Sequence, residues 1–239
     1  MKPFKPIARQ KASEQIAEQI RKSIVDGLLR PGQRLPSERD LAAQFEVTRT
    51  TLREALKKLE SLKLVFIRHG DRATVMDYMR HGGLELLSDL LARRDRVNLG
   101  LLENVMEARV VIGAEVARLA ARRRNDDDLL ELERAVEALE QAVDDDQRFH
   151  ELEFEFFHVL STAAHNLVFV FLLNSIRRLY RNNLEFFAPL VRDTAETAAH
   201  HGRLVAAVRA QDADESTRLA RSFLEAGLVR IAEARRGAS

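Results

Sequence analysis

Apolar residues recur every three or four positions along most of this chain, which is the spacing of helices with one buried face. From Leu99 onward no alternating strand pattern appears, and polar breaks divide the sequence into six predicted helices. They are expected at residues 99–124, 126–143, 147–164, 166–188, 192–210 and 212–235. The pattern predicts a mainly α protein that ends in an antiparallel bundle of six or seven helices, counting a leucine-rich segment before residue 99.

The first 80 residues contain three shorter helical patterns. One runs from Ser13, which is placed to cap it, to about Asp26. A second follows Ser37, and the acidic Asp40 three positions later makes a capping-box arrangement. A third follows Thr48 after a very short link. Two short helices joined this tightly predict a helix-turn-helix.

Two short apolar runs come after the third helix. Residues 64–67 and 73–76 flank Gly70-Asp71, a dipeptide that permits the positive φ of a hairpin turn. This order of strand, turn and strand predicts a small β-hairpin wing with a basic tip.

The third helix has one apolar side and one side of arginines and hydroxyls. Arg49, Thr50 and Arg53 lie about one turn apart on the polar side. Arginine forks pair with guanine edges in a major groove, and hydroxyls donate to phosphates. The polar side therefore has the donors of a DNA-recognition helix, and the alternative is an ordinary solvated face.

The net charge of +1 conceals an uneven distribution. Residues 1–80 contain 17 Lys and Arg against 10 Asp and Glu, a net of +7, whereas the remainder has 21 against 27, a net of −6. The basic part is the part with the predicted helix-turn-helix. A basic module attracts the phosphate backbone and makes binding dependent on salt, so double-stranded DNA is the expected partner.

Composition narrows the class further. The 239 residues are 46% hydrophobic and 31% charged, which suits two domains with cores. There is no cysteine, which excludes disulfides and thiolate catalysis, and no apolar run of about 18 residues. We expect a cytoplasmic protein with no membrane partner. The predicted domains are 1–78, a bridging helix at 79–98 with a hinge at Gly82-Gly83, and 99–239.

Three motifs, at residues 35–42, 47–56 and 67–70, resemble the winged helix-turn-helix of the GntR family of bacterial transcription regulators. They occur in the right order at the right spacing. The residues from Thr48 to Arg53 and the His69-Gly70 pair look most like the FadR branch, which regulates fatty-acid genes. The resemblance implies a homodimer on a pseudo-palindromic operator.

The resemblance assigns the predicted DNA contacts to three groups. Arg49 and Arg53 are expected to read base edges, and His69-Gly70 is expected to enter the minor groove. The remaining residues, assigned to phosphates, are Arg39, Thr48, Thr50, Thr51 and Arg72. The acidic residue after Gly70 departs from FadR-like regulators, which tend to be basic there, so Arg72 is expected to take over that contact.

The second half resembles the FCD-type ligand-binding domain that follows this winged module in the FadR subfamily. Its marks are Arg109 with Glu115 and Ala117, Phe157-His158, Ala164, Asn166, His201, Ala207-Val208 and Asp212. The resemblance implies that a small-molecule effector in this domain biases the placement of the two winged domains.

Arg109 falls on an otherwise apolar stripe of its helix. A buried arginine without a partner is costly, so this one must meet a carboxylate, extend outward or face a polar cavity that awaits an anion. A structural ion pair and an effector contact both fit this pattern, and the resemblance favours the effector.

His158 and His201 are predicted on inner helix faces, where they are weak candidates for metal ligands. Many relatives with this domain bind a divalent metal through an aspartate one turn before the first histidine and a third histidine on the last helix. The matching positions here are Phe154 and Phe223, which offer no lone pair. Two imidazoles alone hold a transition metal weakly, so we expect no metal cofactor. The residues that would have to substitute are His150, Glu151 and Glu155.

Phenylalanines are also frequent on these helices, at positions 154, 157, 169, 171, 186, 187 and 223. They predict an apolar cavity with a few polar groups, which is typical of ligand sites, although phenylalanines on helices often only fill a core. The expected effector residues are Arg109, Phe154, His158, Asn166, Tyr180, His201 and Phe223. The hypothesis is a long-chain acyl-CoA as effector. The alternative is a regulator of carboxylate or sugar-acid metabolism with a metal-assisted effector site.

Two other functions compete with an effector-controlled regulator. A metal hydrolase built on His158 and His201 would lack ligands, and the chain has no Gly-rich phosphate loop or nucleophile elbow, so we expect no enzyme activity. The other is a DNA-binding protein whose helical domain serves only to dimerise.

Overall fold

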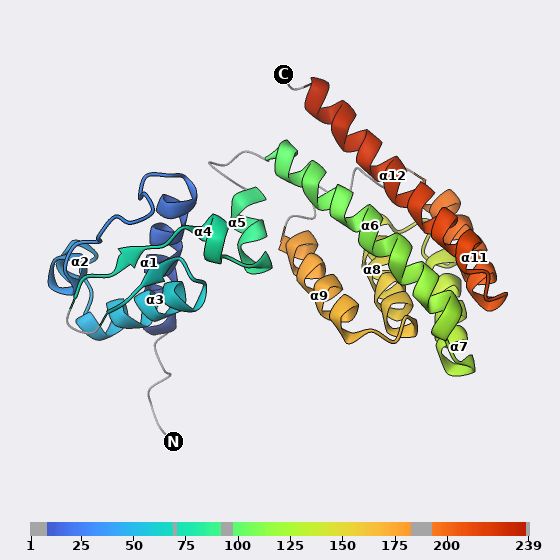
Figure 1. Cartoon of the computed structure of the whole chain (residues 1–239), viewed down its shortest axis with the longest axis horizontal. Coiled ribbons are helices and arrows are strands. Elements are labelled where there is room, and N and C mark those ends of the chain that lie inside the picture. Colours follow the sequence, from blue (N-terminus) through green and yellow to red (C-terminus); the bar gives the residue numbers. More distant parts are fainter. Residues whose placement is uncertain (1–8, 69–70, 92–97, 183–192, 238–239) are drawn as a thin grey trace. The chain divides into compact units, whose positions relative to one another are not determined.

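The computed structural model describes residues 9–68, 71–91, 98–182 and 193–237 (Figure 1). The chain divides into two compact units, Met1–Arg96 and Val97–Ser239. The first unit combines helices with a two-stranded wing and the second is a helical bundle, so the mainly α fold class is confirmed. Within the described residues, no helix is both long and apolar enough to cross a membrane.

Three helices form the framework of the first unit. They are α1 (Arg9–Val25), α2 (Glu38–Gln44) and α3 (Arg49–Ser61). Isoleucines of α1 pack with leucines of α2 and α3 in one core. The Ser13 cap prediction is wrong, because α1 already begins at Arg9 and Ser13 is buried inside it. Ser37 does cap α2 and Thr48 caps α3, as their hydroxyls accept backbone N–H groups three residues on.

The wing is a short antiparallel pair, β1 (Val65–Phe66) and β2 (Thr74–Val75). Val65 lies opposite Val75, and both side chains are buried against the helices. The predicted hairpin is confirmed with shorter strands. The predicted tip residues His69 and Gly70 lie outside the described residues.

The segment after the wing forms α4 (Tyr78–His81), the 3-10 turn η1 (Leu84–Leu86) and α5 (Leu87–Leu91). Leu86 enters the core of the first unit, and Arg21 of α1 lies 3.1 Å from the Asp89 carboxylate. Burial raises the pKa of Asp89 although Arg21 opposes the shift. The leucine-rich segment therefore packs on α1 rather than serving as a seventh bundle helix.

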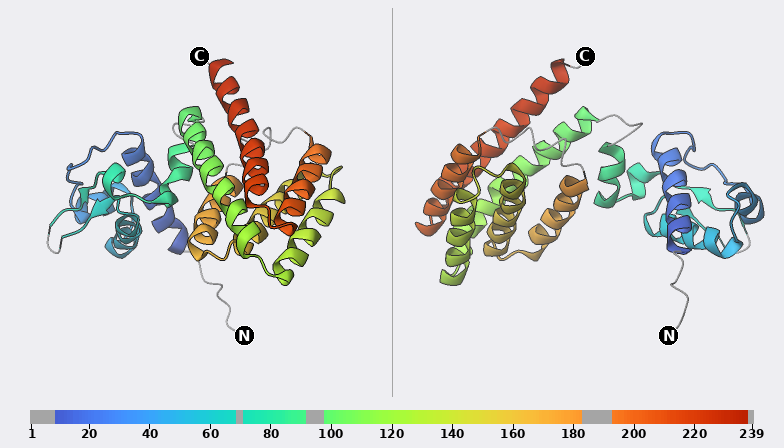
Figure 2. Two further views of the ribbon diagram at one scale, coloured as in Figure 1. Left: turned by 45° about the vertical axis from the view of Figure 1, so that its right-hand side comes forward. Right: turned by 180° about the vertical axis from the view of Figure 1, so that it is seen from behind.

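The second unit is a bundle of long helices (Figures 1 and 2). Its described helices are α6 (Leu99–Arg123), α7 (Asp126–Glu140), α8 (Asp146–Ala163), α9 (Leu167–Asn182), α11 (Thr194–Arg209) and α12 (Ala213–Gly237). Side-chain caps at Asn98, Asn125, Asp145 and Asp193 begin four of them. The predicted helices agree with these within a few residues, except that the end of the 166–188 prediction and Pro189 lie outside the described residues.

Helices α6 and α12 run antiparallel and side by side through the bundle (Figures 1 and 2). Gly113 of α6 allows this close approach, because a Cβ there would lie 2.4 Å from Cδ1 of Leu224 on α12. The core behind this contact is built from α6, α7, α8, α11 and α12.

Candidate DNA interface and effector pocket

The recognition helix α3 has the two faces that its sequence predicts. Leu52, Leu56 and Leu59 are almost fully buried, whereas Arg49, Thr50 and Arg53 are exposed. Thr48 is also exposed, and its hydroxyl oxygen lies 3.3 Å from the backbone nitrogen of Thr51, whose N–H it accepts. The donors predicted to meet DNA on this helix are therefore held at the surface by a well-packed apolar face.

A second helix supports one of these arginines. The Arg53 Nε–H donates to Oε2 of Glu38, the first residue of α2, at 2.7 Å. Sequence reasoning missed Glu38, since helical periodicity says nothing about a contact between two helices 15 residues apart.

Asp71, the acidic residue after Gly70 in the wing, interacts with two neighbouring residues. One carboxylate oxygen of Asp71 accepts the Arg72 N–H at 2.7 Å, and the other lies 3.7 Å from Nη2 of Arg34. A neighbouring arginine thus offsets its negative charge. Arg72 and Arg39 are both exposed, as a phosphate contact requires.

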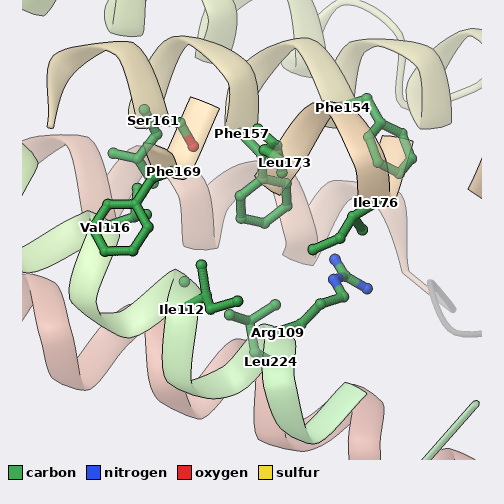
Figure 3. A pocket seen from close by; sticks show the side chains of 12 residues that line it. Arg109, Ile112, Val116, Phe154, Phe157, Ser161, Phe169, Leu173, Ile176 and Leu224 are labelled. Carbon is green, nitrogen blue, oxygen red and sulfur yellow. The ribbon is translucent and has the colours of Figure 1, made fainter. Parts of the chain in front are cut away.

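A pocket opens in the second unit between α6, α8, α9 and α12 (Figure 3). Its cavity volume is about 40 Å³. The lining residues are Arg109, Ile112, Gly113, Val116, Phe154, Phe157, Leu160, Ser161, Phe169, Leu173, Ile176 and Leu224. Apart from Arg109 and Ser161, the lining is wholly apolar.

Arg109 is the charged residue of this lining. Its guanidinium lies near the ring of Phe157 (Figure 3), 6.0 Å from the ring centroid. Its Nη1 lies 3.3 Å from the Met106 sulfur. Arg109 is only half-buried. Its partly exposed side chain is one of the options that its sequence position left open, and the cavity beside it is mainly apolar rather than polar.

The pocket brings together only some of the residues predicted for the effector. Arg109 and Phe154 line it, together with Phe157 and Phe169 of the predicted phenylalanine lining. Phe171 does not, because it lies on the outer side of α9 and is 65% exposed. The Asn166 side chain accepts the Val168 N–H at 3.0 Å, at the start of α9. The Tyr180 side chain and the phenylalanines at 186 and 187 lie outside the described part of the chain.

His201 lies outside this lining, in a cage of phenyl rings. It is 1% exposed, stacks on Phe156 at a centroid distance of 4.3 Å, and meets Phe157 and Phe223 edge-on at 5.4 and 4.8 Å. Neither of its ring nitrogens has a hydrogen-bond partner among the described residues. Phe223 therefore encloses a histidine rather than lining the pocket.

A buried carboxylate lies beside this histidine. Glu153 of α8 is 6% exposed, and its two oxygens lie 3.8 Å from Nε2 of His201 and 3.9 Å from Nδ1 of His150. Burial by itself raises the pKa of Glu153, but contacts with both histidines and the positive charge of Arg109 outweigh it and lower the pKa to about 2. Glu153 is therefore ionised inside the bundle.

Sequence reasoning also missed Glu153, although a signal was present. The residue sits on the same helical stripe as the fully buried Phe149, Phe156 and Leu160, so an acid was visible among core positions. Its partners could not be read in the same way, because His201 comes from α11.

The residues around His201 do not fit the divalent metal of many relatives. Glu153 lies near both His150 and His201, but within the described residues no three His, Asp or Glu side chains form a group that could hold a metal ion. His158 has a buried Nδ1 without a partner, but it forms no such group with His201. Phe157 and Phe223 contact His201 edge-on, and neither ring offers a lone pair to a metal.

Family comparisons agree with both units. Residues 12–75 match the model of bacterial regulatory proteins of the gntR family, and residues 104–226 match the FCD domain. The chain belongs to the GntR family and, within it, to the FCD-containing FadR subfamily. It is a DNA-binding transcription regulator with an effector domain, not an enzyme.

Curated relatives cover nearly the whole chain. The transcriptional regulator Mce2R of Mycobacterium tuberculosis is 34% identical over 93% of this chain and 92% of its own length. The transcriptional repressor NanR of Cronobacter sakazakii is 31% identical over 92% and 85%. The fatty acid metabolism regulator protein of Pasteurella multocida is 32% identical over 80% and 79%. Among solved structures, Lar of Listeria monocytogenes has the same fold, with a TM-score of 0.60 at 16% identity over 96% of this chain and 98% of that one.

Proposed function

We propose that this regulator binds a pseudo-palindromic operator as a homodimer and acts as a repressor whose effector is a long-chain acyl-CoA. The observation that carries the effector proposal is the pocket, where Arg109 borders a lining that is apolar apart from Ser161. An acyl chain suits the apolar walls, and an anionic group suits Arg109. The similarity to a fatty acid metabolism regulator supports the acyl-CoA, and the similarity to NanR supports repression.

On the DNA side, the proposal assigns base reading to Arg49 and Arg53 and phosphate contacts to the hydroxyls and remaining arginines. Two recognition helices of a dimer would enter successive major grooves. The exposed polar face of α3 and the net charge of +7 over residues 1–80 support this assignment.

The size of the cavity adds a requirement for effector binding. A volume of about 40 Å³ exceeds the roughly 10–15 Å³ that one water needs, but it is well below the roughly 300–1,000 Å³ of drug-sized sites. A long acyl chain therefore needs a more open state. Helix α9 is the element proposed to move, since it packs mainly on α8 and carries exposed Leu167, Val168 and Phe171. The effector would select this open state.

The proposed effector site works without a divalent metal. The misfit around His201 supports this part of the proposal. The alternative effector, a carboxylate or sugar acid assisted by a metal, would need His158 and His201 to rearrange.

The test is the fluorescence anisotropy of a labelled DNA fragment from upstream of the protein's own gene. Protein bound to it is titrated with palmitoyl-CoA, with free CoA as the control, and in parallel with zinc plus lactate. Release by palmitoyl-CoA alone, reduced in Arg109→Gln, is the expected result. Release by zinc and lactate alone would contradict the acyl-CoA proposal and favour the metal-assisted alternative.

A further inference from the structure

We infer that Glu38 is a positioning residue that sets the base preference of Arg53. This inference rests on the proposed function, because base reading by Arg53 belongs to that proposal. Glu38 lies on α2 and is only 32% exposed at its side chain, whereas the Arg53 side chain on α3 is 64% exposed. The carboxylate is thus the more buried partner, and the arginine extends further toward solvent.

The hydrogen bond uses one specific edge of the guanidinium. Arg53 has five N–H groups, and its Nε–H donates to Oε2 of Glu38 with an Nε–Oε2 distance of 2.7 Å. The four N–H groups on Nη1 and Nη2 make no hydrogen bond within the described part of the chain. A guanine edge is read by two such donors at once, so the pair leaves Arg53 the donors that bidentate reading needs.

The hydrogen bond to Glu38 also limits how the Arg53 side chain can move. A long, exposed arginine samples many rotamers and loses that freedom when it docks on a base. A charge-assisted bond from a second helix holds the side chain in fewer orientations before DNA arrives. Preorganised donors favour one base over others, whereas a freely rotating arginine can also turn to the phosphates.

The charge of Glu38 has the opposite effect on affinity. A carboxylate on a DNA-facing surface repels phosphates, so its removal should strengthen binding to any sequence. Substituting a residue that only balances charge would change the affinity for all sequences equally. Substituting a positioning residue would change the preference at the base that Arg53 reads.

The chain offers a matched control for this distinction. Glu54 is the neighbour of Arg53 on α3, is exposed, and makes no ion pair among the described residues. Glu38→Ala removes both the charge and the acceptor of the hydrogen bond, whereas a glutamine there would keep an acceptor oxygen. Glu54→Ala removes the same charge from the helix-turn-helix without touching the hydrogen bond. Glu38→Ala and Glu54→Ala should therefore strengthen non-specific binding alike and differ only in base preference.

The experiment uses the full chain and a duplex enriched by the wild-type protein from a randomised pool. Affinity is then measured by competition anisotropy for every single-base substitution of that duplex. Arg53→Ala should lose a preference of about tenfold at one position of each half-site. Glu38→Ala should weaken the same preference about threefold or more, leave other positions unchanged, and have no further effect in Arg53→Ala.

Each other outcome has a definite meaning. A Glu38→Ala profile identical to that of Glu54→Ala would overturn the inference while leaving the proposed function intact. Unchanged base preference in Arg53→Ala would instead overturn base reading by Arg53, which belongs to the proposed function. Thermal melts accompany all variants. If Glu38→Ala unfolds, Glu38→Asp, which keeps the charge but shortens the reach, should show the same loss at the same position, and an unchanged profile would refute the inference.

Discussion

The buried carboxylate of Glu153 leads to a prediction with a magnitude. Glu153 is enclosed by the bundle, with His150 and His201 on either side. Glu153→Gln keeps the shape of the side chain but removes the charge that these neighbours stabilise. We expect the helical unit to lose stability at neutral pH.

The size of the loss follows from the pKa. The pKa of Glu153 falls from 4.5 to about 2 on folding, and each unit corresponds to about 1.4 kcal/mol. The ionised carboxylate therefore stabilises the fold by about 3 kcal/mol at pH 7. Because the folded pKa is the lower one, this stability is present above about pH 4.5 and disappears as the pH falls toward 2.

The assay is urea unfolding of the wild type, Glu153→Gln and a surface control between pH 7 and pH 3. Far-UV circular dichroism gives the free energy of unfolding, and hydrogen exchange of α8 and α11 peptides isolates the helical unit. Glu151→Gln is the control, since it removes an exposed partner of Arg148 on the same helix and should change stability by no more than about 0.5 kcal/mol.

The expected result is a gap of about 3 kcal/mol at pH 7 that narrows below about pH 4.5. Equal stability of Glu153→Gln and wild type at pH 7 would refute the reasoning, because it would mean that Glu153 is not held as an anion. A gap that stays constant down to pH 3 would also refute it, since lost packing does not titrate.

Two further substitutions test the helix contact and the helix cap. Gly113→Ala places a methyl group against Leu224, so overpacking of about 1–3 kcal/mol should outweigh a helix-propensity gain of about 1 kcal/mol, and a thermal melt that rises would contradict the close contact. The same variant narrows the pocket and should weaken the response to palmitoyl-CoA. Thr48→Ala removes the cap of α3 and should lower both stability, by about 1 kcal/mol, and DNA affinity. Thr50→Ala should lower DNA affinity alone, and equal melting of the two variants would argue against the cap.

Short-range features of the sequence are sufficient to predict the helices and strands of this fold. The hydroxyl residues before α2 and α3 and the leucines spaced along α3 are short-range features, and the structure follows them closely. The failure at Ser13 has the same origin. A serine can cap a helix or sit inside one, and only the packing of α1 on α3 decides between them.

The candidate site depends on contacts that no local pattern contains. Glu38 meets Arg53, and Glu153 meets His201, through pairs of helices that the sequence does not align in register. Phe223 was expected to line the pocket, but it packs on His201 because α12 approaches α11 from that side. The residue types were predictable, whereas their partners were set by tertiary packing.

The most direct test of operator reading by α3 is the DNA affinity of Arg49→Ala. Arg80→Ala is the matched control, since it removes an exposed arginine of the same unit outside the helix-turn-helix. Anisotropy on the enriched duplex should show a loss of about tenfold or more for Arg49→Ala, and a smaller loss for Arg80→Ala that is equal for all sequences. Wild-type affinity and selectivity in a folded Arg49→Ala protein would contradict the claim that the exposed face of α3 reads the operator.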